Sequence, residues 1–121
     1  MSNFVVDFYK KEDGSKPLGE FIKSLDVKMK AKVVGNLHLL EEYGNYATEP
    51  LSKHLEDGIF ELRTILGNNI IRVLYFFDKE KIIIATNGFV KKTQKTPKTE
   101  IELAKIRRSD YYRRKEAWIY E

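Results

Sequence analysis

Three apolar segments that follow one another closely along the chain constrain the fold more than any other feature. Residues 59–66, 70–77 and 82–87 are rich in β-branched and aromatic side chains, a composition that favours β-strands. The breaks between them, residues 67–69 and 78–81, are long enough only for hairpins, because a parallel connection needs roughly a dozen residues or more. The sequence therefore predicts a three-stranded antiparallel meander.

The segments on either side of this meander predict one more strand and three helices. Residues 3–10 have the composition of a strand. Apolar side chains at helical spacing over residues 18–25 predict a short helix with Ser15 as its N-cap and Pro17 in its first turn, and a second helix is expected over residues 27–43. A last helix is expected to start near Pro97, since proline is favoured in the first helical turn, and to run to about Arg114.

These elements follow one another in the order βααβββα, which predicts an α+β fold. We expect a small, mostly antiparallel sheet made of the N-terminal strand and the meander. The two N-terminal helices should pack on one face of this sheet, and the C-terminal helix completes the fold. The length of 121 residues fits a single domain spanning residues 1–121.

The composition excludes several classes of protein. The chain has no Cys, which removes disulfides and thiolate metal sites, and its two histidines, His38 and His54, are too few for a conventional zinc site. We therefore expect no metal and no cofactor. No apolar run approaches the ~20 residues of a membrane span, and the first ten residues lack a signal-peptide pattern. The expectation is a cytoplasmic protein without a membrane partner.

The charge of the chain is unevenly distributed. Residues 88–115 carry ten basic and three acidic side chains, a net charge of +7, whereas the rest of the chain has a net charge of −3. A strongly basic segment on a slightly acidic body predicts an acidic partner, either nucleic acid or an acidic protein. The alternative is a helix face that only water covers.

Strand alternation places several charged side chains on one face of the meander. Phe60 and Leu62 should face the helices, which puts Glu61 and Arg63 on the opposite face. A two-residue turn at Gly67-Asn68 would set Arg63 directly across from Arg72, and moving the turn by one residue would change the partner of Arg63 but not its face. An even-length loop after residue 77 would put Asn87 on this face too, beside Arg72 if the turn is Lys79-Glu80.

Two arginines opposite each other repel, so something should compensate their charge. One interpretation is internal, because Glu61 lies on the same face and can bridge Arg63 and Arg72 as a structural ion pair. The other is an external anion, since paired guanidinium groups bind phosphate and stabilise the charge that develops during phosphoryl transfer. A basic segment that follows the meander favours the second interpretation. Its lysines are Lys91, Lys92, Lys95 and Lys98.

These residue types suit the cleavage of RNA without a metal. The 2′-OH of RNA can attack the adjacent phosphorus if the enzyme orients the strand, moves two protons and stabilises the phosphorane charge. Arg63 and Arg72 suit charge stabilisation, Lys91 or Lys92 could bind phosphate or donate a proton, and Glu61 is the nearest candidate base. Further candidates for RNA binding are Lys95, Lys98, Asn87, His54 and Arg108. No cluster of Asp, Glu or His near these arginines has ligand spacing, which argues against metal-assisted hydrolysis.

Three stretches of the sequence together form a specific pattern. They are Leu-Glu-Asp-Gly-Ile-Phe-Glu-Leu-Arg at residues 55–63, Ile-Arg-Val-Leu-Tyr-Phe at 71–76 and Gly-Phe-Val-Lys-Lys-Thr-Gln-Lys-Thr-Pro at 88–97. With these stretches the chain resembles the phage-derived HigB-type toxins of the RelE/ParE superfamily. The resemblance implies a RelE-like fold and a bacterial type II toxin that cleaves mRNA on the translating ribosome. It also implies neutralisation by a small helix-turn-helix, HigA-like antitoxin, with operator DNA contacted only through that antitoxin.

The resemblance carries functional residues to four positions of this chain. The strand arginines of the family correspond to Arg63 and Arg72, and its basic residues after the last strand correspond to Lys91 and Lys92. Many relatives place a Tyr or His acid/base after that strand, where this chain has Lys-Lys-Thr-Gln-Lys. The superfamily also contains ParE-like toxins, which inhibit a protein target such as DNA gyrase without cutting RNA. That function is the alternative, and an inactive phage remnant is a third.

Overall fold

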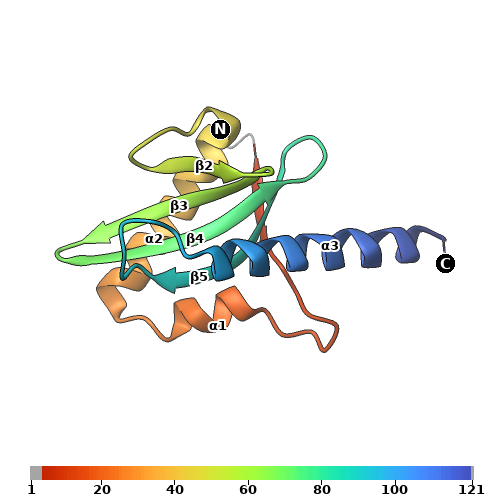
Figure 1. Ribbon diagram of the computed structural model, residues 1–121, viewed down its shortest axis with the longest axis horizontal. Coiled ribbons are helices and arrows are strands. Elements are labelled where there is room, and N and C mark those ends of the chain that lie inside the picture. The colour runs from red at the N-terminus through yellow and green to blue at the C-terminus, as the bar shows by residue number, and fades with distance from the viewer. Residues whose placement is uncertain (1–3, 121) are drawn as a thin grey trace.

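The computed structural model describes residues 4–120, which form a five-stranded sheet with helices on both faces (Figure 1). Helices α1 and α2 cover one face, and α3 crosses the other. The elements are β1 (Val5–Phe8), α1 (Pro17–Lys23), α2 (Val27–Tyr43), a 3-10 turn η1 (Gly44–Tyr46), β2 (Ser52–Glu56), β3 (Ile59–Leu66), β4 (Asn69–Phe77), β5 (Ile82–Val90) and α3 (Lys98–Tyr120). No helix among these residues is long and apolar enough to cross a membrane.

The α+β class is confirmed, but the expected order βααβββα is wrong by one strand. The additional strand is β2, which pairs antiparallel with β3 at one edge of the sheet. Its sequence, Ser-Lys-His-Leu-Glu, has no apolar alternation, because an edge strand has only one neighbour and two of its five side chains are exposed. The sheet is also mixed, since β1 forms the other edge and pairs parallel with β5.

The meander of β3, β4 and β5 is confirmed, and so is the register of its first hairpin. Leu66 pairs with Asn69 across the two-residue turn Gly67-Asn68, and Arg63 lies directly opposite Arg72. The backbone of Gly67 has a φ of 61°, a conformation that favours glycine in such a turn. The turn residues therefore set the pairing on which the candidate site depends.

In the second hairpin, Asn87 lies on the expected face of the sheet, but the loop and the register differ from those considered for the sequence. Tyr75 pairs with Ala85, but Leu74 pairs with Asn87, so a bulge at Thr86 shifts the register by one residue. The connection after β4 is longer than the two-residue turn considered for the sequence, since the Asp78 N–H bonds to the Ile82 carbonyl. The bulge restores the alternation that this loop would have reversed. Asn87 consequently shares the face of Arg72 without lying beside it, and Phe89 is the residue opposite Arg72.

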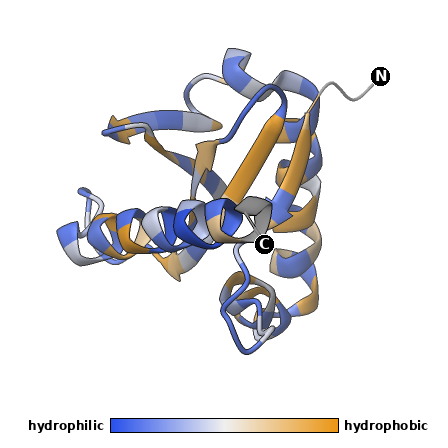
Figure 2. Ribbon diagram, turned by 90° about the vertical axis from the view of Figure 1, so that its right-hand side faces the viewer, coloured by the Kyte–Doolittle hydropathy of each residue, from blue (hydrophilic) through white to orange (hydrophobic). Residues whose placement is uncertain are grey.

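The two faces of the sheet bury two separate apolar clusters. Leu62, Val73 and Tyr75 pack under α1 and α2, as the alternation of β3 predicts. On the other face, Leu74 and Phe76 pack under α3. Figure 2 shows hydrophobic residues concentrated on the central strands, whereas α3 is largely hydrophilic. Most of α3 therefore presents polar side chains, and one narrow apolar side holds it to the sheet.

Candidate active site

The charged residues that the sequence brings together border a cavity of about 350 Å³ on the α3 side of the sheet. Its walls come from β2, β3, β4, the start of α3 and residues 91–97, which connect β5 to α3 and are called the lysine loop below. This volume lies at the lower end of the range for ligand pockets, roughly 300–1,000 Å³. The charged lining residues are Lys53, Glu56, Glu61, Arg63, Arg72 and Lys95, and His54 also lines the cavity.

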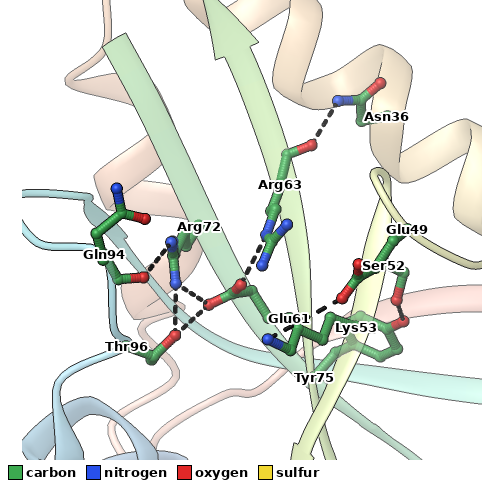
Figure 3. A network of polar contacts seen from close by, with 10 residues as sticks. All are labelled: Asn36, Glu49, Ser52, Lys53, Glu61, Arg63, Arg72, Tyr75, Gln94 and Thr96. Carbon is green, nitrogen blue, oxygen red and sulfur yellow. Dashed lines mark hydrogen bonds and ion pairs between the residues drawn. The ribbon is translucent and has the colours of Figure 1, made fainter.

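Glu61 joins the two opposed arginines (Figure 3). Its Oε2 accepts a hydrogen bond from Arg63 Nε at 3.0 Å, and its Oε1 accepts one from Arg72 Nη1 at 2.8 Å. The Glu61 side chain is fully buried between them. The internal ion pair, one of the two interpretations of the sequence, is thus present and offsets the repulsion between the guanidinium groups.

Arg72 is committed to the lysine loop as well as to Glu61. Its Nη1 donates to Thr96 Oγ at 2.6 Å, and its Nη2 donates to the Gln94 carbonyl at 3.1 Å. The side chain is only 3% exposed, and its Nε is buried without a partner among the described residues. An external anion could reach Arg72 only by displacing the loop.

Arg63 has the same charge but a different situation. Its side chain is 24% exposed, and only its Nε is engaged, by Glu61. Neither Nη atom makes a hydrogen bond to any residue that the structure describes. Because Arg63 lines the cavity, its pair of Nη groups is available to an anion that enters it. Arg63 is thus the accessible member of the pair.

The lysine loop brings unpaired cations to the same region. Lys92, Lys95 and Lys98 are exposed and Lys91 is partly buried. Across residues 4–120, none of these four amines takes part in a hydrogen bond or an ion pair. Lys95 lines the cavity directly, while the Lys91 N–H bonds to the Ile70 carbonyl at 2.8 Å and holds the start of the loop against β4.

Lys53 is a cation at the cavity that the sequence interpretation missed. It lies on β2 opposite Glu61, and its amine has only a long ion pair with Glu49, at 4.0 Å. Recognising it required β2, whose polar composition gave no strand signal. The nearest usable signal is the period of two in Ser-Lys-His, because it places Lys53 on the face opposite the buried Ser52.

Comparison with known proteins identifies the family. The model of the family described as "Phage derived protein Gp49-like" matches residues 20–109, well over half of the chain. The chain belongs to this Gp49-like family. The matched region of the Gp49-like protein contains both arginines, Glu61, Lys53 and the whole lysine loop.

The Gp49-like protein also shares its fold with a chain of the crystal structure of the archaeal RelE–RelB complex from Pyrococcus horikoshii OT3. The match covers 78% of this chain and 99% of that one, with 19% sequence identity and a TM-score of 0.52. At this identity the likeness is one of fold. No curated protein matches. The resemblance to phage-derived proteins of RelE type is confirmed at the level of family and fold.

Two of the predicted RNA-binding residues are engaged inside the Gp49-like fold. Asn87 is buried and donates from Nδ2 to Glu100 Oε1 at 3.0 Å, which ties β5 to the first turn of α3. Arg108 donates from Nη1 to the Asp57 carbonyl at the turn between β2 and β3. These contacts place both residues in structural roles within this arrangement.

His54 contributes to the cavity wall, but its ring contacts the other side of the hairpin. It pairs with Phe60, whose side chain belongs to the cluster under α1 and α2, and the two rings meet edge to face at 5.0 Å. Its Nε2 accepts a hydrogen bond from the Gly58 N–H at 3.2 Å. The imidazole therefore braces the turn.

The basic residues of α3 from Lys105 onward are paired, in contrast to Lys98 at the start of the helix and to the lysine loop. Each of them bonds to a carboxylate or a carbonyl oxygen of another element or of the helix itself. The contacts are Lys105 with Glu56 and Asp57, Arg107 with the Thr86 carbonyl, Arg113 with Asp110 and Glu12, Arg114 with Asp110 and the Lys10 carbonyl, and Lys115 with Asp78.

Asp78 is one of two carboxylates in this set, with Asp110, whose pKa is strongly lowered. Burial alone would raise its pKa, but the Lys115 amine, the Tyr111 hydroxyl and the Lys79 N–H outweigh that effect and lower the pKa to about 2. Tyr111 donates to Asp78 Oδ2 at 2.6 Å, and burial together with this carboxylate raises the pKa of the phenol. Tyr111 also packs edge to face on Phe76, so it belongs to the core under α3.

Among residues 4–120, no three His, Asp or Glu side chains gather as a metal site.

Proposed function

We propose that this Gp49-like protein is the toxin of a type II toxin–antitoxin system and a metal-independent endoribonuclease that cleaves mRNA on the ribosome. The observation that carries the proposal is Arg63, whose two Nη groups are free at a cavity bordered by the unpaired amine of Lys95 and by Lys53. Such a set of cations suits a phosphodiester, because it binds phosphate oxygens and stabilises the extra charge of the transition state.

The reaction needs no group beyond the RNA, solvent water and the side chains at the cavity. The 2′-OH attacks the adjacent phosphorus and gives its proton to water, the bond from phosphorus to the 5′ oxygen breaks, and that oxygen takes up a proton from a lysine ammonium. The products are a 2′,3′-cyclic phosphate and a 5′-hydroxyl end. Arg63 would stabilise the phosphorane oxygens with both Nη groups. Lys91 and Lys92 would hold neighbouring phosphates.

The proton for the departing 5′ oxygen comes from an amine at the cavity wall. Both oxygens of Glu61 already accept hydrogen bonds from the arginines, and Oε1 also accepts one from Thr96, so we assign Glu61 a positioning role instead of that of a base. The Lys95 amine has no partner among the residues that the structure describes, and the Lys53 amine has one long ion pair. A lysine ammonium at neutral pH can give a proton to the departing 5′ oxygen.

The proposal includes an antitoxin and a cytoplasmic site of action. A basic active face is silenced efficiently by an acidic segment held near it, because complementary charge speeds association. One solved structure with a similar fold is that of an archaeal RelE–RelB complex. The narrower HigB-type assignment predicts a HigA-like, helix-turn-helix antitoxin. In the complex, only this antitoxin would contact operator DNA.

Replacing Arg63 tests the proposal. Arg63→Ala should abolish growth arrest and transcript cleavage, an effect of at least about 100-fold if both Nη contacts act in the transition state. The measurement is a map of transcript 5′ ends after brief induction of the toxin without its neighbour. The matched control is Arg113→Ala, which removes an exposed arginine of α3 and should leave cleavage unchanged.

Cuts within translated frames that disappear in Arg63→Ala support the nuclease. Intact transcripts together with loss of DNA supercoiling would instead assign a ParE-like inhibitor of gyrase. Normal growth on induction of the wild-type protein would contradict both functions and indicate an inactive remnant.

A further inference from the structure

We infer that Thr96 is a positioning residue of the proposed nuclease, because its hydroxyl, held between Glu61 and Arg72, locks the lysine loop in the orientation that presents Lys95 to the cavity. The inference rests on the proposed function and refines it. It divides the two arginines into Arg63, which contacts RNA, and Arg72, which acts through the loop.

The first observation is the double use of one hydroxyl. Thr96 Oγ donates a hydrogen bond to Glu61 Oε1 and accepts one from Arg72 Nη1 at 2.6 Å (Figure 3). Only a group that is both donor and acceptor fits between a carboxylate and a guanidinium. Thr96 is buried, whereas the residues on either side of it in the chain, Lys95 and Pro97, are exposed. The loop thus inserts one side chain into the sheet and leaves its neighbours in solvent.

The second observation is that Arg72 holds the loop at two points. Its Nη1 reaches Thr96 and its Nη2 reaches the carbonyl of Gln94. These anchors flank Lys95, so the direction of the Lys95 side chain follows from the attachment of its neighbours. The start of the loop is fixed separately by the hydrogen bond from the Lys91 N–H to the Ile70 carbonyl.

The third observation is that Arg72 offers nothing to a ligand in this arrangement. Its side chain is 3% exposed and its Nε is buried without a partner among the described residues. A loop that is already ordered loses little conformational freedom when RNA binds, which raises affinity without a new contact. Arg72 and Thr96 would therefore contribute to cleavage by ordering the loop, and Lys95 would be the group that meets the phosphate.

The test compares three substitutions of threonine. Thr96→Val removes the hydroxyl and keeps the shape, Thr96→Ser restores the hydroxyl, and Thr99→Val makes the same change at an exposed residue whose hydroxyl has no hydrogen bond within residues 4–120. The first readout is the rate of limited digestion by trypsin after Lys91, Lys92 and Lys95. We expect Thr96→Val to speed these cuts about 10-fold, in line with the loss of buried hydrogen bonds. Thr96→Ser and Thr99→Val should behave like the wild type.

The second readout is a double-mutant cycle on the kcat/KM for RNA cleavage. Lys95→Ala should lower kcat/KM about 10-fold in the wild-type background and have almost no effect in the Thr96→Val background, since the amine is no longer held in place. Effects that multiply independently would show that Thr96 does not act through Lys95 and would overturn the positioning role.

The two readouts separate this inference from the function on which it rests. Unchanged trypsin rates in Thr96→Val contradict the lock, whether or not the protein cleaves RNA. A wild-type protein that leaves RNA intact contradicts the nuclease, while the trypsin rates still decide whether the loop is locked. If Thr96→Val fails to fold, the test uses the wild-type protein alone and compares it with a short unstructured peptide of the same loop sequence. Trypsin cuts after Lys95 that are as fast in the protein as in the peptide would contradict the ordering of the loop by Thr96.

Discussion

The lysine loop and helix α3 share a basic composition but use it differently. The side-chain amines of the three lysines of the loop, and that of Lys98 at the first residue of α3, have no partner within the part of the chain that the structure describes. The basic side chains of α3 from Lys105 onward all bond to carboxylates or carbonyls of the protein. The formal charge of a segment therefore does not identify a binding surface. A cation that already satisfies an internal anion holds the fold together, and one without a partner remains available to a ligand.

The largest expected effect comes from removing the free cations. The triple substitution Lys91→Ala, Lys92→Ala and Lys95→Ala should lower kcat/KM for RNA cleavage about 1,000-fold, because each amine would lose one charge-assisted contact to phosphate. The midpoint of thermal unfolding should stay within about 2 °C of the wild type, since none of the three amines bonds to a residue that the structure describes. Cleavage at the wild-type rate would contradict the role of the unpaired lysines in binding RNA.

A smaller effect, on stability and not on activity, is expected from the helix side. Asp78→Asn should lower the free energy of unfolding by about 2 kcal/mol, because it removes a buried carboxylate that accepts hydrogen bonds from Lys115 and Tyr111. Chemical denaturation measures this, with Glu116→Gln on the exposed side of α3 as the control. RNA cleavage at a temperature where the variant is folded should not change. A stable variant that loses cleavage would place α3 in the active face.

The smallest effect is the pH dependence of the same contact. The pKa of Asp78 is lowered to about 2 in the folded protein, so its stabilising contribution is complete above the ordinary aspartate pKa of about 4 and is lost as the pH falls toward 2. The stability difference between the wild type and Asp78→Asn should therefore narrow between pH 5 and pH 2. Denaturation curves at several pH values check this, and a constant difference would mean that the carboxylate does not carry the contact.

Much of the candidate site follows from short-range rules. The Gly67-Asn68 turn and the alternation of β3 and β4 suffice to place Arg63 opposite Arg72 with Glu61 on the same face, and the structure confirms each of these placements. Asn87 also reaches the predicted face, but only because a bulge compensates for a longer loop. Turn residues have local preferences that the sequence displays, whereas bulges depend on how neighbouring strands pack.

Other parts of the site depend on contacts between distant segments. Strand β2 and its Lys53 carry no apolar alternation, because only part of this edge strand is covered and pairing with β3 holds it in the sheet. The bond between Thr96 and Glu61 joins residues 35 positions apart, and no local pattern marks a threonine as buried in a basic segment. Secondary-structure propensity does not predict such contacts, since the partners meet only when the sheet and the loop have formed.

By itself, the sequence determined the class of the fold, the meander, the opposed arginines and the family resemblance, because periodicity and turn chemistry act over a few residues. Only the tertiary structure decided which cations are free. Lys95 and Lys105 have the same side chain and lie in the same basic stretch, yet Lys105 meets Glu56 and Asp57 across the fold and Lys95 meets no anion among the described residues. Electrostatic pairing depends on distance in space, and folding sets that distance.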